Sequence, residues 1–100
     1  MRVCVIGGSG FLGSHVADQL SGTGHEVLIY DRSPSPWLQA EQSMQVGDVL
    51  AFESLLEAVK GCHAVYNFAA LADLNDALDK PIETANINVL GNAYVLEACR

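Results

Sequence analysis

The glycine-rich segment at residues 7–13 constrains the fold of this chain more than any other part of the sequence. It reads Gly-Gly-Ser-Gly-Phe-Leu-Gly and follows directly on the apolar run Val-Cys-Val-Ile at residues 3–6. A strand that ends in glycines can turn sharply and lets the backbone approach a ligand with no Cβ in the way. The helix expected after it would offer unpaired N–H groups and a positive dipole end to an anion. The segment therefore predicts a strand, a turn and a helix that bind a phosphate-bearing ligand.

The glycines of this segment fit two spacings of a dinucleotide-binding turn. Gly8, Gly10 and Gly13 give G-x-G-x-x-G, whereas Gly7, Gly10 and Gly13 give G-x-x-G-x-x-G. Spacing alone does not choose between them, and an ordinary glycine-rich turn would show the same letters. The wider sequence has to supply a helix after the turn and an acidic residue about 20 positions further on.

A helix and a second strand follow in the order that such a site needs. Leu12, Val16 and Leu20 recur every four residues, which predicts one buried stripe on a helix. The helix is expected to end at residues 21–24, Ser-Gly-Thr-Gly, and the apolar run at residues 27–30 is expected to form the second strand.

Asp31 ends that second strand and is the second informative residue. Its carboxylate can accept hydrogen bonds from both hydroxyls of an adenosine ribose, and its charge would repel a 2′-phosphate. Asp31 therefore favours NAD over NADP, and the alternative is a solvated turn residue. Arg32 is a candidate partner for a 2′-phosphate, but we expect it to be a surface side chain near the adenine.

The rest of the chain continues the alternation of strand and helix. Residues 44–47 and 64–68 have the composition of short strands, residues 52–59 have helical spacing, and a last helix is expected to begin at Pro81. Units that alternate in this way predict an α/β fold with right-handed crossovers. We expect a Rossmann-type open parallel sheet with strand order 3-2-1-4 and helices on both faces.

In such a sheet the ligand crevice lies outside the carboxyl ends of the first and fourth strands, where the winding reverses. Residues 7–12 would form one wall and residues 68–72, Phe-Ala-Ala-Leu-Ala, the other, where small side chains permit close approach of a flat ring system. Asp48 ends the third strand and could accept a hydrogen bond from an adenine amino group. The alternative is that Asp48 caps the helix that begins near residue 51.

Composition and charge exclude several functions. The chain has 100 residues, half of them apolar, so we expect residues 1–100 to form one domain. Its net charge is −7, with no basic patch for nucleic acid or an anionic membrane, and no apolar run approaches the length of a bilayer span. Asp73, Asp76 and Asp79 indicate a solvated loop rather than a metal site. With three irregularly spaced cysteines, we expect a cytoplasmic protein with reduced thiols and no metal.

These motifs resemble the extended short-chain dehydrogenase/reductase family, and within it the NAD-dependent epimerase/dehydratase group that acts on nucleotide sugars. The matching segments, in chain order, are GGSGFLGSH at 7–15, GHEV at 24–27 with the aspartate at 31, GD at 47–48, NFAA at 67–70 and NVLGN at 88–92. The resemblance covers the whole chain, as the N-terminal part of a longer family architecture. It favours the frame of Gly7, Gly10 and Gly13 for the glycine turn.

The resemblance implies a role for each matched residue. The pyrophosphate turn would be formed by Gly7, Gly10, Phe11, Leu12 and Gly13. At the adenosine end, Asp31 would accept hydrogen bonds from the ribose with Arg32 beside it, and Asp48 and Val49 would contact the adenine. At the other end, Phe68, Ala69, Ala70 and Ala72 would lie beside the nicotinamide ribose, and Asn88 would be the helix asparagine near the nicotinamide. Ala72 departs from a lysine found there in some epimerases, which removes one ribose contact. The family's matching helix contributes to a dimer, so residues 81–100 are a candidate homodimer surface; the alternative is that their apolar side chains cover the sheet.

The family's catalytic Tyr-x-x-x-Lys pair has no match here, because Tyr30, Tyr66 and Tyr94 are followed four residues on by proline, alanine and alanine. The resemblance implies that this pair and a Ser or Thr come after the last helix. We therefore assign no catalytic residue and expect these 100 residues to be inactive alone. The leading hypothesis is the NAD-binding part of a nucleotide-sugar epimerase or dehydratase. The alternatives are an NADP-linked ketone or ester reductase of the same superfamily and a non-catalytic dinucleotide-sensing module.

Overall fold

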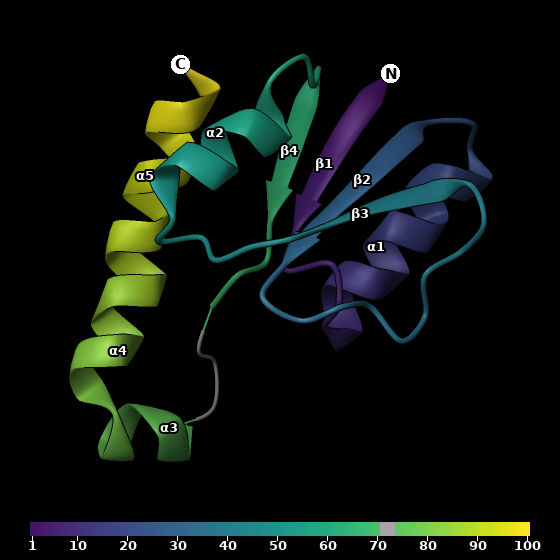
Figure 1. The fold of residues 1–100 in the computed structure, drawn as a ribbon. Coiled ribbons are helices and arrows are strands. Elements are labelled where there is room, and N and C mark those ends of the chain that lie inside the picture. Colours follow the sequence, from purple (N-terminus) through teal and green to yellow (C-terminus); the bar gives the residue numbers. More distant parts are fainter. Residues whose placement is uncertain (71–73) are drawn as a thin grey trace.

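Among residues 1–70 and 74–100, which a computed structural model describes, four strands form one parallel sheet (Figure 1). The strands are β1 (Arg2–Ile6), β2 (Glu26–Asp31), β3 (Gln42–Val46) and β4 (Ala64–Asn67). Their order in the sheet is β3-β2-β1-β4, and every neighbouring pair is parallel. The predicted Rossmann-type sheet with strand order 3-2-1-4 is confirmed.

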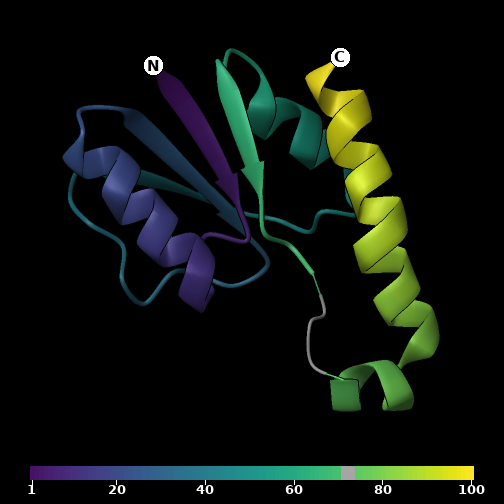
Figure 2. The same cartoon turned by 180° about the vertical axis from the view of Figure 1, so that it is seen from behind.

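Helices cover both faces of this sheet, as predicted. The helix α1 (Phe11–Gly22) lies on the face turned toward the viewer in Figure 2, and α2 (Phe52–Val59) and α5 (Gly91–Cys99) lie on the other. A helical column is formed by α4 (Pro81–Ala85), the π-helical turn η1 (Asn86–Leu90) and α5, with α3 (Leu74–Asp79) at its far end (Figure 1). The proline at the start of α4 fits because the first N–H groups of a helix have no intrahelical partner.

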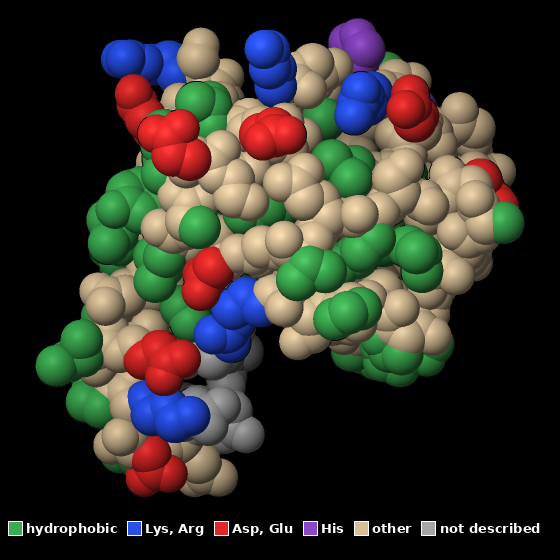
Figure 3. Space-filling view, viewed as in Figure 1, with side chains coloured by type: hydrophobic (Ala, Val, Ile, Leu, Met, Phe, Trp, Pro, Cys, Tyr) green, Lys and Arg blue, Asp and Glu red, His purple; other side chains and the backbone are tan. Residues whose placement is uncertain are grey.

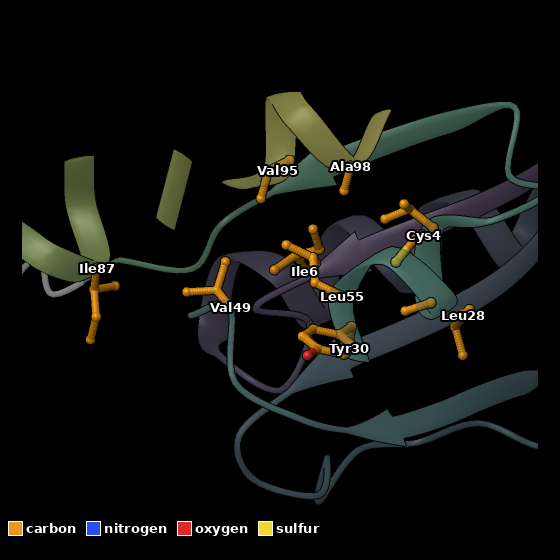
Figure 4. Packing of buried hydrophobic residues seen from close by; sticks show 11 residues of the cluster. Cys4, Ile6, Leu28, Tyr30, Val49, Leu55, Ile87, Val95 and Ala98 are labelled. Carbon is orange, nitrogen blue, oxygen red and sulfur yellow. The ribbon is translucent and has the colours of Figure 1, made fainter. Parts of the chain in front are cut away.

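The two central strands, β1 and β2, are apolar because both of their faces are buried. Side chains of β1 alternate between two clusters, with Cys4 and Ile6 directed to α2 and α5 (Figure 4), and Val3 and Val5 directed to α1. Burial raises the pKa of the Cys4 thiol to about 12. Cys4 is therefore a protonated, apolar core side chain, as expected for a buried strand.

The predicted buried stripe on α1 is wrong at its first position. Leu12 is 59% exposed, and the fully buried residues of α1 are Gly13, Ser14 and Ala17. Small side chains on that face let the helix approach the sheet closely. Leu20, at the other end of the predicted stripe, is partly buried against the same face of the sheet.

Some element bounds, and one loop, also differ from the predictions. The strand β3 begins at Gln42 rather than residue 44, because the buried Gln42 amide donates hydrogen bonds to Asp18 Oδ1 at 3.0 Å and Ser21 Oγ at 3.1 Å. The strand β4 ends at Asn67 rather than at residue 68. Residues 74–79 form α3 where we expected a loop, and they include the helix-forming types Leu and Ala. The aspartate at 73 lies outside the described residues.

Candidate dinucleotide site

A cavity of about 170 Å³ opens at the carboxyl ends of β1, β2 and β4. The winding of the sheet reverses at this edge, since β1 lies between β2 and β4. The cavity is lined by Ile6, Gly7, Gly10, Tyr30, Asp31, Arg32, Gly47, Asp48, Val49, Phe68, Ala69, Ala70 and Ile87. Complete ligand pockets usually exceed about 300 Å³, so the described residues enclose one portion of a site for a ligand as long as a dinucleotide.

Packing within the protein requires glycine at several positions of the turn. Gly7 has a φ of +78°, and a Cβ there would lie 2.6 Å from the carbonyl carbon of Phe68. A Cβ on Gly8 would lie 2.7 Å from the Ile29 side chain, and one on Gly13 would overlap the carbonyl oxygen of Gly7. Each predicted glycine frame therefore contains residues that the fold itself needs.

Gly10 differs from them, because the protein leaves room for a side chain there. Its φ is −80°, and the nearest atom to an added Cβ would be the Gly7 carbonyl oxygen at 3.5 Å, an ordinary contact. Gly10 is the N-cap of α1 and lines the cavity. No described side chain caps α1, and its first turn holds no acidic residue. The N–H groups and positive dipole end are left for an anion, so this cradle fits a pyrophosphate.

Asp31 lies at the end of β2 beside this turn. Its Oδ2 accepts a hydrogen bond from the backbone N–H of Ser9 at 3.0 Å, and its Oδ1 accepts one from the N–H of Ser33 at 3.3 Å. These bonds hold the carboxylate at the cavity wall, and each oxygen keeps acceptor capacity for a donor such as a ribose hydroxyl. The role of ribose acceptor stays a prediction, and this geometry fits it.

Arg32 lies at the rim of the cavity, on the surface as expected. Its Nη1 is 3.7 Å from Oε1 of Glu83 in α4, and both side chains are about half exposed. The ion pair therefore bridges the end of β2 and the helical column.

Asp48 lines the cavity but does not cap α2. The N-cap position of α2 is Ala51, and Asp48 Oδ1 instead accepts a hydrogen bond from the Leu50 N–H at 2.9 Å, which fixes a turn before the helix. The Asp48 carbonyl oxygen accepts a hydrogen bond from the Tyr30 hydroxyl at 2.7 Å. Burial raises the pKa of Tyr30, so this phenol stays a donor. The helix-cap alternative for Asp48 is therefore wrong.

Val49 joins the cavity to the helical column. It lines the cavity, and a Cβ on Gly91 of α5 would lie 3.0 Å from its Cγ1. The glycine lets the column approach the loop after β3. On the opposite wall, Asn67 Oδ1 accepts a hydrogen bond from the Ala69 N–H at 3.0 Å and so orients the lining residues 68–70.

Several predicted site residues do not line the cavity. Phe11 is 78% exposed and stacks edge-on against His15, and Leu12 is also exposed. Gly13 packs beneath the turn, and Asn88 lies in η1 beside a lining residue. Ala72 lies outside the described residues.

Four lining residues were missed. Ile6, Tyr30 and Gly47 each directly precede a predicted site residue, so the signal was their position at a strand end. A Cβ on Gly47 would lie 2.7 Å from the ring of Tyr30, which explains the glycine. Ile87 had no local signal beyond its neighbour Asn88, because its place depends on long-range packing of η1.

Two further findings concern the described part of the chain. No group of three or more His, Cys, Asp and Glu side chains in residues 1–70 and 74–100 could hold a metal ion. The helices found there are too short or too polar to traverse a bilayer.

The fold and the site together define a Rossmann-type dinucleotide-binding unit, with its glycine turn, uncapped helix N-terminus and acid after the second strand. Residues 3–100 match the NAD dependent epimerase/dehydratase family, and the chain belongs to that family. The predicted cofactor, NAD, is thus the cofactor of the family.

Individual relatives include epimerases and reductases. The 2-alkyl-3-oxoalkanoate reductase of Stenotrophomonas maltophilia (strain K279a) is 37% identical over 101 residues, which cover 100% of this chain and 30% of that protein. The UDP-glucose 4-epimerase of Yersinia pestis is 34% identical, over 100% of this chain and 33% of that protein. The crystal structure of UDP-glucose 4-epimerase from Thermus thermophilus in complex with NAD superposes with a TM-score of 0.90 at 30% identity, over 99% of this chain and 33% of that one. The chain therefore spans about a third of the length of these relatives.

Proposed function

We propose that this chain is the NAD-binding portion of a nucleotide-sugar epimerase or dehydratase. The observation that carries the proposal is the presence of the uncapped α1 N-terminus at Gly10 and the Asp31 carboxylate on one cavity. NAD, when bound, supplies an acceptor for a hydride from a sugar carbon. The similarity to UDP-glucose 4-epimerases supports a nucleotide-sugar substrate.

In this proposal the pyrophosphate lies against the turn at Gly7 and Gly10 and accepts hydrogen bonds from the first N–H groups of α1, whose dipole stabilises its charge. The N–H groups of Gly7 and Gly10 themselves already donate to the carbonyl oxygens of Tyr30 and Gly7, at 2.8 and 3.2 Å. Asp31 accepts hydrogen bonds from the ribose hydroxyls. Its bonds from Ser9 and Ser33 orient the carboxylate in advance, which lowers the ordering cost of binding.

The remaining residues bind the two ends of the cofactor, the adenine and the nicotinamide ribose. Asp48 and Val49 bind the adenine, and residues 68–70 lie beside the nicotinamide ribose. Asn88 completes that end as the family pattern implies, whereas Ala72 lacks the ribose contact that a lysine makes in some epimerases. This chain matches about a third of its relatives, and we assign the catalytic proton transfers to the part of such an enzyme that lies outside the matched third. These 100 residues would therefore bind NAD without turnover.

An NADP-linked reductase of ketones or esters is the second candidate. Arg32 at the cavity rim and the 37% identity to a 2-alkyl-3-oxoalkanoate reductase favour it. Tighter binding of NADP than of NAD by the wild-type chain would support this candidate over the first.

We also propose that the chain folds as one domain of a cytoplasmic protein and forms a homodimer through the helical column. Cys4, Cys62 and Cys99 are free thiols, which suits a reducing compartment. Ile82, Val89 and Leu96 recur every seven residues on the column and are 76%, 71% and 74% exposed. Figure 3 shows hydrophobic side chains along the outer edge of this column. Apolar residues at heptad spacing suit pairing with the same helix of a second copy.

Val89→Ala is expected to weaken such a dimer about tenfold, because two apolar carbons are lost from each subunit at a partly buried seam. Sedimentation velocity over a range of protein concentrations measures this. Leu56→Ala, at an exposed apolar residue of α2, is the matched control and should leave association unchanged. A wild-type chain that stays monomeric at high concentration contradicts the dimer.

Asp31→Ala is expected to weaken NAD binding about tenfold, through loss of charge-assisted hydrogen bonds to the ribose. Isothermal titration calorimetry with NAD and with ADP-ribose measures the effect. Both ligands should lose affinity equally, because they share the adenosine ribose.

Glu57→Ala is the matched control, since it removes an equal charge from an exposed position on α2 outside the cavity. It should bind as the wild type does. If the folded wild-type chain gives no heat of binding with either ligand, the proposed function is wrong.

A further inference from the structure

Two residues at the end of β2 give opposite signals about the cofactor. The Asp31 carboxylate disfavours a 2′-phosphate on the adenosine ribose, whereas a guanidinium such as that of Arg32 binds phosphate well through paired N–H donors. Both side chains line the same cavity. The position of the Arg32 guanidinium therefore decides how strongly the site can favour a cofactor with a 2′-phosphate.

The Arg32 guanidinium is paired with the carboxylate of Glu83. The Arg32 Nη1 lies 3.7 Å from Glu83 Oε1, and the pair joins two separate elements, the end of β2 and α4. Figure 3 shows acidic and basic side chains alternating down the face where the helical column joins the sheet. A 2′-phosphate would have to displace the Glu83 carboxylate from Arg32 before it could pair with the guanidinium.

Glu83 lies on a regular hydrogen-bonded turn of helix. Within α4, the Thr84 N–H and hydroxyl both donate hydrogen bonds to the Lys80 carbonyl oxygen, at 2.9 and 2.8 Å. The same column continues into η1, whose Ile87 lines the cavity, and into α5, whose Gly91 contacts Val49. The carboxylate is therefore carried by the outer part of a helical column whose η1 and α5 segments reach the cavity and Val49, while α4 itself has no buried residue.

We propose that Glu83 is a positioning residue for cofactor specificity, which holds the Arg32 guanidinium toward α4 and so favours NAD over NADP. This inference rests on the proposed NAD-binding function and adds to it a residue of α4 that does not line the cavity. Glu83 itself touches neither the ribose nor the pyrophosphate in this proposal. It acts through Arg32.

Dissociation constants for NAD and NADP, measured by calorimetry on the 100-residue chain, test the inference. Glu83→Gln is expected to raise NADP affinity about threefold to fivefold, the range of an exposed ion pair, and to leave NAD affinity unchanged. In an Arg32→Ala background the same substitution should have no effect, because the guanidinium it releases is gone. The gain in the single variant should shrink as salt screens the pair.

Glu97→Gln is the matched control, since it breaks an exposed ion pair with Arg100, 3.3 Å long, at the opposite end of the column. It should change neither affinity. An equal change for NAD and NADP in Glu83→Gln, or a gain in NADP affinity that persists without Arg32, overturns the inference while the proposed function stands. Wild-type chain that binds neither nucleotide overturns the proposed function itself.

Discussion

Gly13→Ala is expected to lower the free energy of unfolding by about 3 kcal/mol. The added Cβ would overlap the carbonyl oxygen of Gly7 and lie 2.9 Å from its carbon and 3.0 Å from the Gly8 Cα. These are backbone atoms of the turn between β1 and α1, so no side-chain rotation relieves the overlap, and the helix has to move off the sheet. For a domain of this size the loss corresponds to a fall in Tm of roughly 12–24 °C.

Gly22→Ala in the same helix is the matched control for this prediction. An added Cβ at Gly22 meets nothing within 4 Å, and alanine is the better helix former by about 1 kcal/mol. Thermal unfolding followed by circular dichroism should show Gly22→Ala at or above the wild-type Tm and Gly13→Ala far below it. If the two variants melt together, the close approach of α1 to the turn is wrong.

The same glycine shows why the sheet was easier to predict than the packing of α1. The strand order was expected from the alternation of apolar runs with helical segments, and the run from Val3 to Ile6 is buried on both faces. The spacing rule for helices instead assigned burial to the large apolar Leu12 and passed over Gly13. Where a helix lies close to a sheet, small residues are buried and large ones are turned out at the rim, so side-chain size misleads.

The candidate site divides in the same way. Gly7, Gly10 and Asp31 were predicted because each follows from local chemistry at a strand end, and the structure brings them to one cavity. The Arg32–Glu83 pair and the lining role of Ile87 join segments more than fifty residues apart, roughly half of the chain. No local pattern reports such contacts, because they depend on where η1 and α4 pack after the sheet has formed.

Gly10→Ala is expected to separate cofactor binding from stability. Its backbone conformation suits alanine, the added Cβ makes only ordinary contact with the protein, and the reduced freedom of the unfolded chain offsets the weaker N-cap preference. Tm should therefore stay close to the wild-type value. NAD affinity should fall about a hundredfold, because a methyl group at the cavity wall keeps the pyrophosphate from the N–H groups of α1, and charge-assisted hydrogen bonds of that kind are worth about 1.5–3 kcal/mol each.

Calorimetric titration with NAD and with inorganic pyrophosphate measures this loss, and both ligands should lose affinity together because the clash lies at the phosphates. Gly22→Ala at the other end of α1 should bind both as the wild type does. Full NAD affinity in a folded Gly10→Ala variant would mean that the pyrophosphate lies elsewhere, and the glycine turn would then serve the fold alone. Loss of binding at unchanged Tm instead identifies Gly10 as the one glycine of the turn whose requirement comes from the ligand, since Gly7, Gly8 and Gly13 are already required by packing.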